Sequence, residues 1–347
     1  MKNINFATLL LLLTFSLLSC KNKSQKSFAI RDFKQSLQPY LTAIVSKGIV
    51  GFDSSTRFID ANLTYEELKQ LSNSEHPVLR ATAFRIMLEK PNLNHFDLLM
   101  THLDDTAIVA TDAGEWGIRY YTIADDIIHN STWKNMSEKN KTIDAVITKH
   151  NYLRSAYTIL TQIPTDLKYY SYIKEMAQRN RPFDEIEYAL YALAKYKKAE
   201  DVNIIKELLL SNSWGMGFES FKLMEEFPNN AYLEVYKNYF KHVFYRKICR
   251  DHDNTNATEF IKSFATYKID SSAAVLNIIL NKKPFMPCTA DTNTLKYELA
   301  YAIWNNKCEA YSKLRKQIEG YVKEQEKDRF GLPMDKPEIV TPEKITW

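Results

Sequence analysis

Glycine is scarce in this chain, and its scarcity limits the folds that the chain can adopt. The 347 residues include only 8 Gly, about 2% against a usual share of about 7%. Parallel α/β enzymes need glycine in phosphate-binding loops, and β-sandwiches need it in hairpins. Because 45% of the residues are hydrophobic and 25% are charged, intrinsic disorder is excluded. The composition therefore predicts an all-α protein whose helices are joined by short polar loops.

Amphipathic segments recur along the chain, and residues 183–212 form the clearest one. The first half of this segment carries apolar residues at helical spacing: Ile186, Ala189, Leu190 and Leu193. The second half carries another apolar stripe: Val202, Ile205, Leu208 and Leu209. Corresponding first helices recur about every 30 to 45 residues, which is the period of helix-pair repeats; their marker residues are Ala156, Ala189, Ser220, Phe264 and Ala300. Stacked pairs of this kind would share one continuous core.

The stretch from His76 to Ala83 carries a second repeat signal. Pro77, Arg80 and Ala83 stand in the order Pro-x-x-Arg-x-x-Ala. This opening, like the unit at 183–212, resembles a HEAT repeat. The resemblance implies an α-solenoid of HEAT-like helix pairs, and we assign residues 28–327 to this domain. A helical bundle without repeats is the alternative.

Local signals predict where several helices begin and end. Thr64 and Glu67 have the spacing of a capping box, and Pro77 suits the first position of a helix. Thr165 is expected to cap a helix over 166–178, and residues 231–249 are expected to form one long helix. Three prolines in residues 328–347 predict an extended C-terminal tail.

The N-terminus has the pattern of an export signal. Lys2 precedes a mostly apolar run over residues 4–18 that ends in Leu17-Leu18-Ser19-Cys20. The run is shorter than the roughly 20 residues that cross a bilayer, so residues 1–19 are predicted to be a cleaved signal peptide. The ending resembles the lipobox of bacterial lipoproteins, which implies a diacylglyceryl group on Cys20 and a fatty acyl group such as palmitate on its new amine. A secretory signal with an incidental Cys20 is the alternative.

The residues after Cys20 bear on the compartment. Residues 20–27 comprise the lipidated cysteine and a polar tether without apolar side chains. Lys21 is not the aspartate that marks inner-membrane retention in similar lipoproteins, and the tether has no acidic run. The resemblance therefore implies attachment through Cys20 to the outer membrane, facing the periplasm. In that oxidising compartment the remaining cysteines, Cys249, Cys288 and Cys308, allow at most one disulfide or remain free.

The charge pattern and the motifs indicate no familiar chemistry. The formal net charge is +4, without a long basic stripe, so we expect no nucleic-acid partner. The sequence has no GxSxG, HExxH, Walker or CxxC motif, and we predict no catalytic residue and no cofactor.

One helix face could hold a metal ion. Asp125 and Asp126 lie four and three residues before His129, so their side chains would share a face. A metal site needs further ligands from other helices, and the available donors are Glu115, His95 and His102. The alternative, which we prefer, is that these are solvated helix residues. The loop at 251–256 resembles a calcium loop but has Asn256 and Lys262 where such loops have Gly and Glu.

Three tryptophans are candidates for a binding surface. Trp116, Trp133 and Trp214 lie near expected helix ends, where aromatic side chains can contact partners. They can equally fill gaps between stacked helix pairs. We therefore expect a membrane-anchored helical-repeat scaffold or adaptor that binds a protein or peptide in the cell envelope. The alternatives are a structural envelope lipoprotein without a defined ligand and a metal-dependent or lyase-like enzyme.

Overall fold

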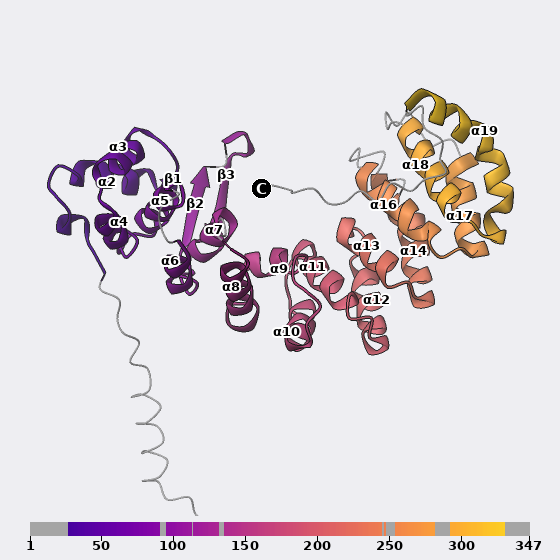
Figure 1. The fold of residues 1–347 in the computed structure, drawn as a ribbon, viewed down its shortest axis with the longest axis horizontal. Coiled ribbons are helices and arrows are strands. Elements are labelled where there is room, and N and C mark those ends of the chain that lie inside the picture. Colours follow the sequence, from indigo (N-terminus) through magenta and orange to yellow (C-terminus); the bar gives the residue numbers. More distant parts are fainter. Residues whose placement is uncertain are drawn as a thin grey trace, which may run out of the picture. The chain divides into compact units, whose positions relative to one another are not determined.

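The computed structural model describes residues 27–90, 95–112, 114–131, 135–244, 246–247, 254–281 and 292–329. These residues are mostly helical, which confirms the helical fold class. The chain divides into two compact units, Met1–Ser155 and Ala156–Trp347 (Figure 1). Among the described residues, no helix combines the length and the apolar character needed to cross a bilayer.

The first unit combines helices with a small sheet. Its helices are α2 (Gln38–Lys47), α3 (Ser54–Asn62), α4 (Tyr65–Leu71), α5 (Pro77–Leu88), α6 (His95–Thr101), α7 (Ile123–Asn130) and α8 (Met136–Lys149). The strands β1 (Ile49–Val50), β2 (Ile108–Asp112) and β3 (Ile118–Thr122) form one sheet in that order. Short 3₁₀ turns occupy Ile30–Asp32 and Gly114–Trp116. This sheet was not expected from the sequence, which predicted helices throughout.

The sheet is parallel at one edge and antiparallel at the other. β1 pairs with β2 in parallel, with Ile49 opposite Ala110. β2 pairs with β3 in antiparallel register, with Ala110 opposite Tyr120. Helix α5 packs against β1 and β2, and α7 packs against β3 (Figure 1).

Two of the predicted helix starts in the first unit are confirmed. The Thr64 hydroxyl accepts the Glu67 N–H at 3.3 Å, and the Glu67 carboxylate accepts the Thr64 N–H at 2.9 Å, which completes the capping box. Pro77 occupies the first turn of α5. Arg80 then forms a bidentate pair with Asp105, at 2.7 and 3.0 Å, and donates to the Ser74 carbonyl at 2.8 Å.

The second unit is a succession of helices. They are α9 (Arg154–Ile159, which starts just before the boundary), α10 (Leu167–Ala177), α11 (Phe183–Ala194), α12 (Val202–Ser211), α13 (Phe218–Glu226), α14 (Leu233–Tyr239), α16 (Asn254–Ala265), α17 (Asp270–Asn281), α18 (Thr292–Asn305) and α19 (Ser312–Arg329). Short 3₁₀ turns at Ala199–Asp201, Asn230–Tyr232 and Glu309–Tyr311 lead into α12, α14 and α19.

Alternate helices of this unit contact one another in chain order. Helix α11 packs on α13, α13 on α16, and α16 on α18; we call these four helices the helix row. Helices α10, α17 and α19 each pack on a helix of the row, and α12 packs on α14. Ala189 and Leu190 in α11 are fully buried, as the apolar spacing predicted.

The structure corrects three local predictions in the second unit. Asp166, not Thr165, caps α10, because its carboxylate accepts the Lys168 N–H at 2.9 Å. The long helix expected over 231–249 is instead a 3₁₀ turn, α14 and a π-helical segment over Phe240–Phe244. In this π-helical segment Phe240 stacks on Phe260, and Phe244 packs against the same ring in a tilted arrangement. Leu208 is only half-buried, whereas Leu209 is fully buried.

Candidate ligand-binding pocket

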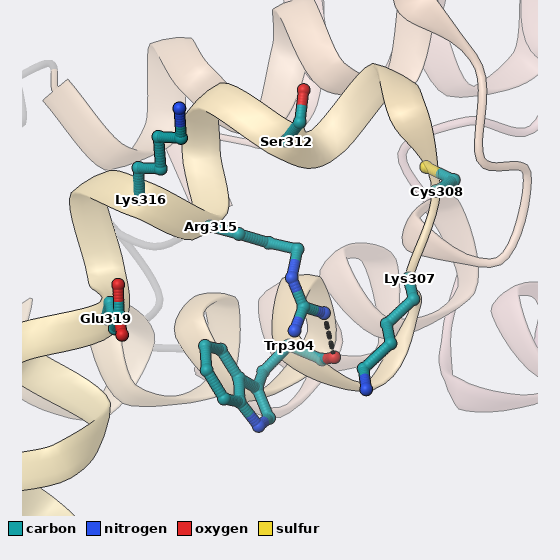
Figure 2. A pocket seen from close by; sticks show the side chains of 7 residues that line it. All are labelled: Trp304, Lys307, Cys308, Ser312, Arg315, Lys316 and Glu319. Carbon is teal, nitrogen blue, oxygen red and sulfur yellow. Dashed lines mark hydrogen bonds between the residues drawn. The ribbon is translucent and has the colours of Figure 1, made fainter.

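An open pocket lies where the last two helices of the second unit meet. It has a volume of about 680 Å³ and is lined by Trp304 from the end of α18, by the connection that follows, and by the first turns of α19. The lining side chains are Trp304, Lys307, Cys308, Ser312, Arg315, Lys316 and Glu319 (Figure 2). The 3₁₀ turn at Glu309–Tyr311 fixes this connection by burying Tyr311.

Arg315 is held against Trp304 across the pocket. Its Nη1 donates a hydrogen bond to the Trp304 carbonyl oxygen at 2.5 Å, and its guanidinium carbon lies 4.4 Å from the centroid of the indole ring (Figure 2). This stacking combines a cation–π attraction with a fixed side-chain position. The guanidinium has five N–H donors in a rigid fork, so donors remain for a ligand in the pocket.

The charges that line the pocket are predominantly positive. Lys307, Arg315 and Lys316 contribute three cations, and Glu319 contributes the single carboxylate. Among the described residues, no acidic side chain forms an ion pair with Lys307 or Lys316, and both lysines are exposed. A guanidinium beside an aromatic ring and flanked by ammonium groups is suited to bind a carboxylate or another small anion.

Cys308 contributes a half-buried thiol to the wall of the pocket. It is a free cysteine in the structure. Cys249 and Cys288, with which a disulfide was considered, lie outside the described residues, as does Cys20.

The two aspartates of the expected metal-binding face form hydrogen bonds and an ion pair with protein groups. Asp125 accepts hydrogen bonds from the Ser155 N–H at 2.8 Å and the Ser155 hydroxyl at 2.6 Å. Asp126 pairs with Arg85 at 3.0 Å. His129 is exposed, so the buried aspartates and this imidazole do not converge. The part of the chain that the structure describes holds no cluster of three metal-ligating side chains.

Two of the other donors considered for that face, His102 and Glu115, have described side chains. His102 is buried with its ring edge against Phe84, 4.7 Å between ring centroids, and burial holds its pKa below the usual value. It lines a second, smaller pocket beside Arg80 and Asp105. Glu115 is exposed in the turn between β2 and β3. The side chain of His95 lies outside the described part of the structure.

Of the three tryptophan candidates, only the side chain of Trp214 is described. It is 49% exposed in the connection between α12 and α13, with the Arg246 guanidinium 5.8 Å from its ring. Trp116 ends the turn between β2 and β3, but its side chain, like the whole of Trp133, lies outside the described residues.

The pocket residues were not among the sequence candidates. The available signal was Trp304 followed by Lys307 at the end of one expected helix, with Arg315 and Lys316 early in the next. This spacing becomes meaningful only once the two helices are antiparallel neighbours.

Comparisons with known proteins found no match to this chain. No protein-family model, no curated protein and no solved structure matches the chain.

Proposed function

We propose that this protein is a lipid-anchored helical-repeat adaptor that binds a protein or peptide partner in the cell envelope. The observation that carries the proposal is the pocket between α18 and α19, where Arg315 is fixed over Trp304 among two further cations. An acidic side chain or a C-terminal carboxylate of the partner would pair with the free donors of Arg315. The adjacent indole would contact the apolar part of the same segment.

The order of helix contacts supports a HEAT-like solenoid as the body of the adaptor. The four helices of the row begin at residues 183, 218, 254 and 292. Each is followed in the chain by a second helix, and these second helices, α12, α14, α17 and α19, begin at residues 202, 233, 270 and 312. Each helix of the row packs on the next one. Serial nearest-neighbour packing is the defining contact pattern of helix-pair solenoids. Such arrays present extended surfaces to protein partners.

The anchor rests on the sequence alone. The apolar run at 4–18 and the Leu-Leu-Ser-Cys ending support acylation of Cys20. Two or more acyl chains hold a protein stably on a membrane, whereas one chain binds only marginally. We place the protein on the outer membrane, facing the periplasm, because Lys21 follows the modified cysteine.

The test is a cross-linked pull-down from envelope extract with the full-length lipidated chain. The bait is compared with Arg315→Glu, which reverses the charge in the pocket, and with Lys237→Glu, a control on an exposed residue of α14. We expect a partner that is captured by the wild type and by Lys237→Glu but lost with Arg315→Glu. Equal capture by all three would exclude the pocket as the binding site. No specific partner with any bait would overturn the adaptor function.

A further inference from the structure

The segment at the start of the first unit is held on the turn that precedes α5. The Phe28 N–H donates to the Asn73 carbonyl oxygen at 3.1 Å, and the Glu75 N–H donates to the Phe28 carbonyl oxygen at 3.0 Å, which forms a short parallel bridge. We call residues 27–29 and 73–75 together the N-terminal latch. Single hydrogen bonds contribute only modestly to stability, so the groups that support residues 73–75 decide whether the latch stays closed.

Arg80 on α5 connects the latch to the turn after α6. Its Nη1 donates to the Ser74 carbonyl oxygen at 2.8 Å, while Nε and Nη2 donate to the two carboxylate oxygens of Asp105 at 2.7 and 3.0 Å. The side chains of Arg80 and Asp105 are 16% and 14% exposed. Asp105 orients the guanidinium, and the guanidinium fixes the Ser74 carbonyl group. Loss of the ion pair would therefore weaken the latch.

The imidazole of His102 is buried beside this ion pair. The Asp105 N–H donates to the His102 carbonyl oxygen at 3.0 Å, so both residues belong to one turn. His102 is 6% exposed, and its ring lies edge-on to Phe84, one helical turn after Arg80 on α5. Within the described part of the chain, the Nε2 atom of His102 has no hydrogen-bond partner. These surroundings favour a neutral ring.

The smaller pocket of the first unit brings these parts together. It has a volume of about 280 Å³, and its lining includes Ser27 and Asn73 from the latch, Arg80, Asp105 and His102. A pocket of this size admits several water molecules. A proton can therefore reach the cluster from solvent while the unit remains folded.

The charges that act on His102 come from the same ion pair. Burial lowers the pKa of His102 below its ordinary value of 6.5, the Asp105 carboxylate raises it in part, and Arg80 lowers it again. Other charged groups on the neighbouring elements have partners of their own or are exposed. They are Arg85 on α5 with Asp126 on α7, Asp125 on α7 with Ser155, Asp104 after α6 with His150 at the end of α8, Glu75 with His76 before α5, and the exposed Asp97 on α6.

We propose that His102 is the proton sensor of an acid-sensitive N-terminal latch: a proton taken up by its ring separates Arg80 from Asp105 and opens the latch. The imidazolium places a second cation beside Arg80 and competes with it for the Asp105 carboxylate. Arg80 then no longer fixes the Ser74 carbonyl group. The step takes one proton from solvent and breaks no covalent bond. With the proposed anchor at Cys20, opening lengthens the tether between the membrane and the first unit.

The open and closed states of the latch bind this proton with different affinities. In the open latch the ring is in water and has its ordinary pKa of 6.5, whereas in the closed latch its pKa is lower. The closed latch is therefore most stable above pH 6.5 and loses stability as the pH falls below that value, by at most about tenfold in the opening equilibrium per pH unit. The latch lies in the first unit and does not depend on the adaptor function, so failure of the Arg315 variant in the pull-down leaves it unaffected.

The first test is hydrogen exchange on the full-length lipidated chain in detergent micelles, at about pH 7.5 and about pH 5. We expect the protection factors of the Phe28 and Glu75 amides, corrected for the intrinsic pH dependence of exchange, to fall at the lower pH. The Leu63 amide, which donates to the Ile59 carbonyl oxygen at the end of α3, should keep its protection. Protection at Phe28 and Glu75 that is independent of pH would overturn the proposal. An equal loss at Leu63 would also overturn it, because acid would then unfold the whole unit.

The second test replaces the proposed sensor. His102→Phe keeps an aromatic ring against Phe84 but cannot take up a proton, so protection of the latch should be equal at the two pH values. His76→Gln, beside the latch, and His129→Gln, on an exposed residue of α7, are the controls and should show the wild-type fall. An unchanged fall in His102→Phe, or its loss in His76→Gln, would assign the sensing to another group and overturn the proposal.

A titration of the wild-type chain by nuclear magnetic resonance tests the sensor without any substitution. The ring signals of His102 should titrate with a midpoint below the ordinary value of 6.5. The latch should lose its amide protection over the same pH range. A midpoint at or above the ordinary value would overturn the proposal, because the closed latch would then not oppose the proton.

Discussion

The carboxylate of Glu187 on α11 accepts a hydrogen bond from the hydroxyl of Ser220 on α13, at 3.0 Å. The same carboxylate oxygen accepts the Gly217 N–H at 3.1 Å. Gly217 is the N-cap of α13 and has no side chain to cap the helix, so Glu187 satisfies this helix start from the neighbouring helix of the row. A Cβ atom at Gly217 would lie only 2.9 Å from Glu187 Oε1, which explains why glycine suits this close approach.

Burial of Glu187 makes the α11–α13 contact sensitive to pH. Its pKa is raised to about 7, first by burial and then by the nearby carboxylates of Glu219 and Asp184, against an ordinary value of 4.5. Between pH 4.5 and 7 the folded chain keeps a proton that the unfolded chain releases, so the free energy of unfolding falls as pH rises. The protonated carboxyl contributes fully below this range, and its contribution is lost above it.

Glu187→Gln should remove this pH dependence, because an amide keeps the acceptor oxygen but does not titrate. Relative to wild type, the variant should gain about 2–3 kcal/mol in the free energy of unfolding between pH 4.5 and pH 8. Urea unfolding at both pH values measures the difference. Glu207→Gln, on an exposed residue of α12, should track the wild type. Parallel pH profiles for wild type and Glu187→Gln would contradict the prediction.

A charged pair links α10 to the start of α12. Lys174 Nζ lies 2.7 Å from Asp201 Oδ1, and the Tyr170 hydroxyl lies 2.9 Å from Asp201 Oδ2. Asp201 is fully buried, and its hydrogen bond raises the pKa of Lys174 to about 12. Asp201→Asn should lower the free energy of unfolding by about 2–3 kcal/mol, because it leaves the ammonium without its carboxylate.

A double-mutant cycle separates this pairing from general effects of substitution. Lys174→Met alone should also destabilise, since it leaves Asp201 buried without a cation. The double variant should cost less than the sum of the two single variants. Lys237→Met, an exposed control on α14, should change the free energy of unfolding little. Additive single effects would show that the pair does not act as a unit.

The bidentate ion pair of Arg80 and Asp105 should likewise stabilise the first unit against unfolding. Lysine cannot reproduce the planar fork that reaches both carboxylate oxygens and the Ser74 carbonyl. Arg80→Lys should therefore destabilise this unit by about 1–2 kcal/mol, detected as lost amide protection in α5. Arg57→Lys, on an exposed residue of α3, is the matched control. Equal protection in both variants would contradict the assigned role.

The features predicted correctly from the sequence depend on neighbouring residues. The capping box at Thr64, the proline at the start of α5 and the apolar stripe around Ala189 each lie within one or two helical turns. Their signals are therefore complete in a short window. Asp166 replaced Thr165 as a cap because two adjacent residues competed for the same helix start, and the sequence offered no way to choose between them.

The features that were missed depend on contacts between distant segments. The glycines Gly114 and Gly117, which adopt φ of 64° and 73° in the turn between β2 and β3, were a usable turn signal in the sequence. The third strand, Ile49–Val50, joins from far upstream, and two residues carry no periodicity. Likewise, Arg315 meets Trp304 only because α18 and α19 pack together, so the pocket could not be predicted from spacing alone.

Lipidation of Cys20 remains a prediction from the sequence. Cys20→Ala should prevent acylation and leave either an uncleaved precursor or a soluble product. Mass spectrometry of the N-terminal peptide and membrane fractionation measure both effects. Cys308→Ala, at the free cysteine of the pocket, should remain acylated and membrane-bound. An acylated, membrane-bound Cys20→Ala protein would show that Cys20 is not the anchor.

The repeat organisation is tested by a buried leucine in α12. Leu209 is fully buried, whereas the adjacent Leu208 is half-buried. Leu209→Ala should therefore lower the free energy of unfolding by about 2–5 kcal/mol, and Leu208→Ala by clearly less. In a solenoid each repeat touches only its neighbours, so Leu209→Ala should reduce amide protection mainly in α11 to α14. Protection in α18 and α19 should persist. A uniform loss across the second unit would instead indicate one cooperative bundle, because such a bundle transmits the loss to every helix at once.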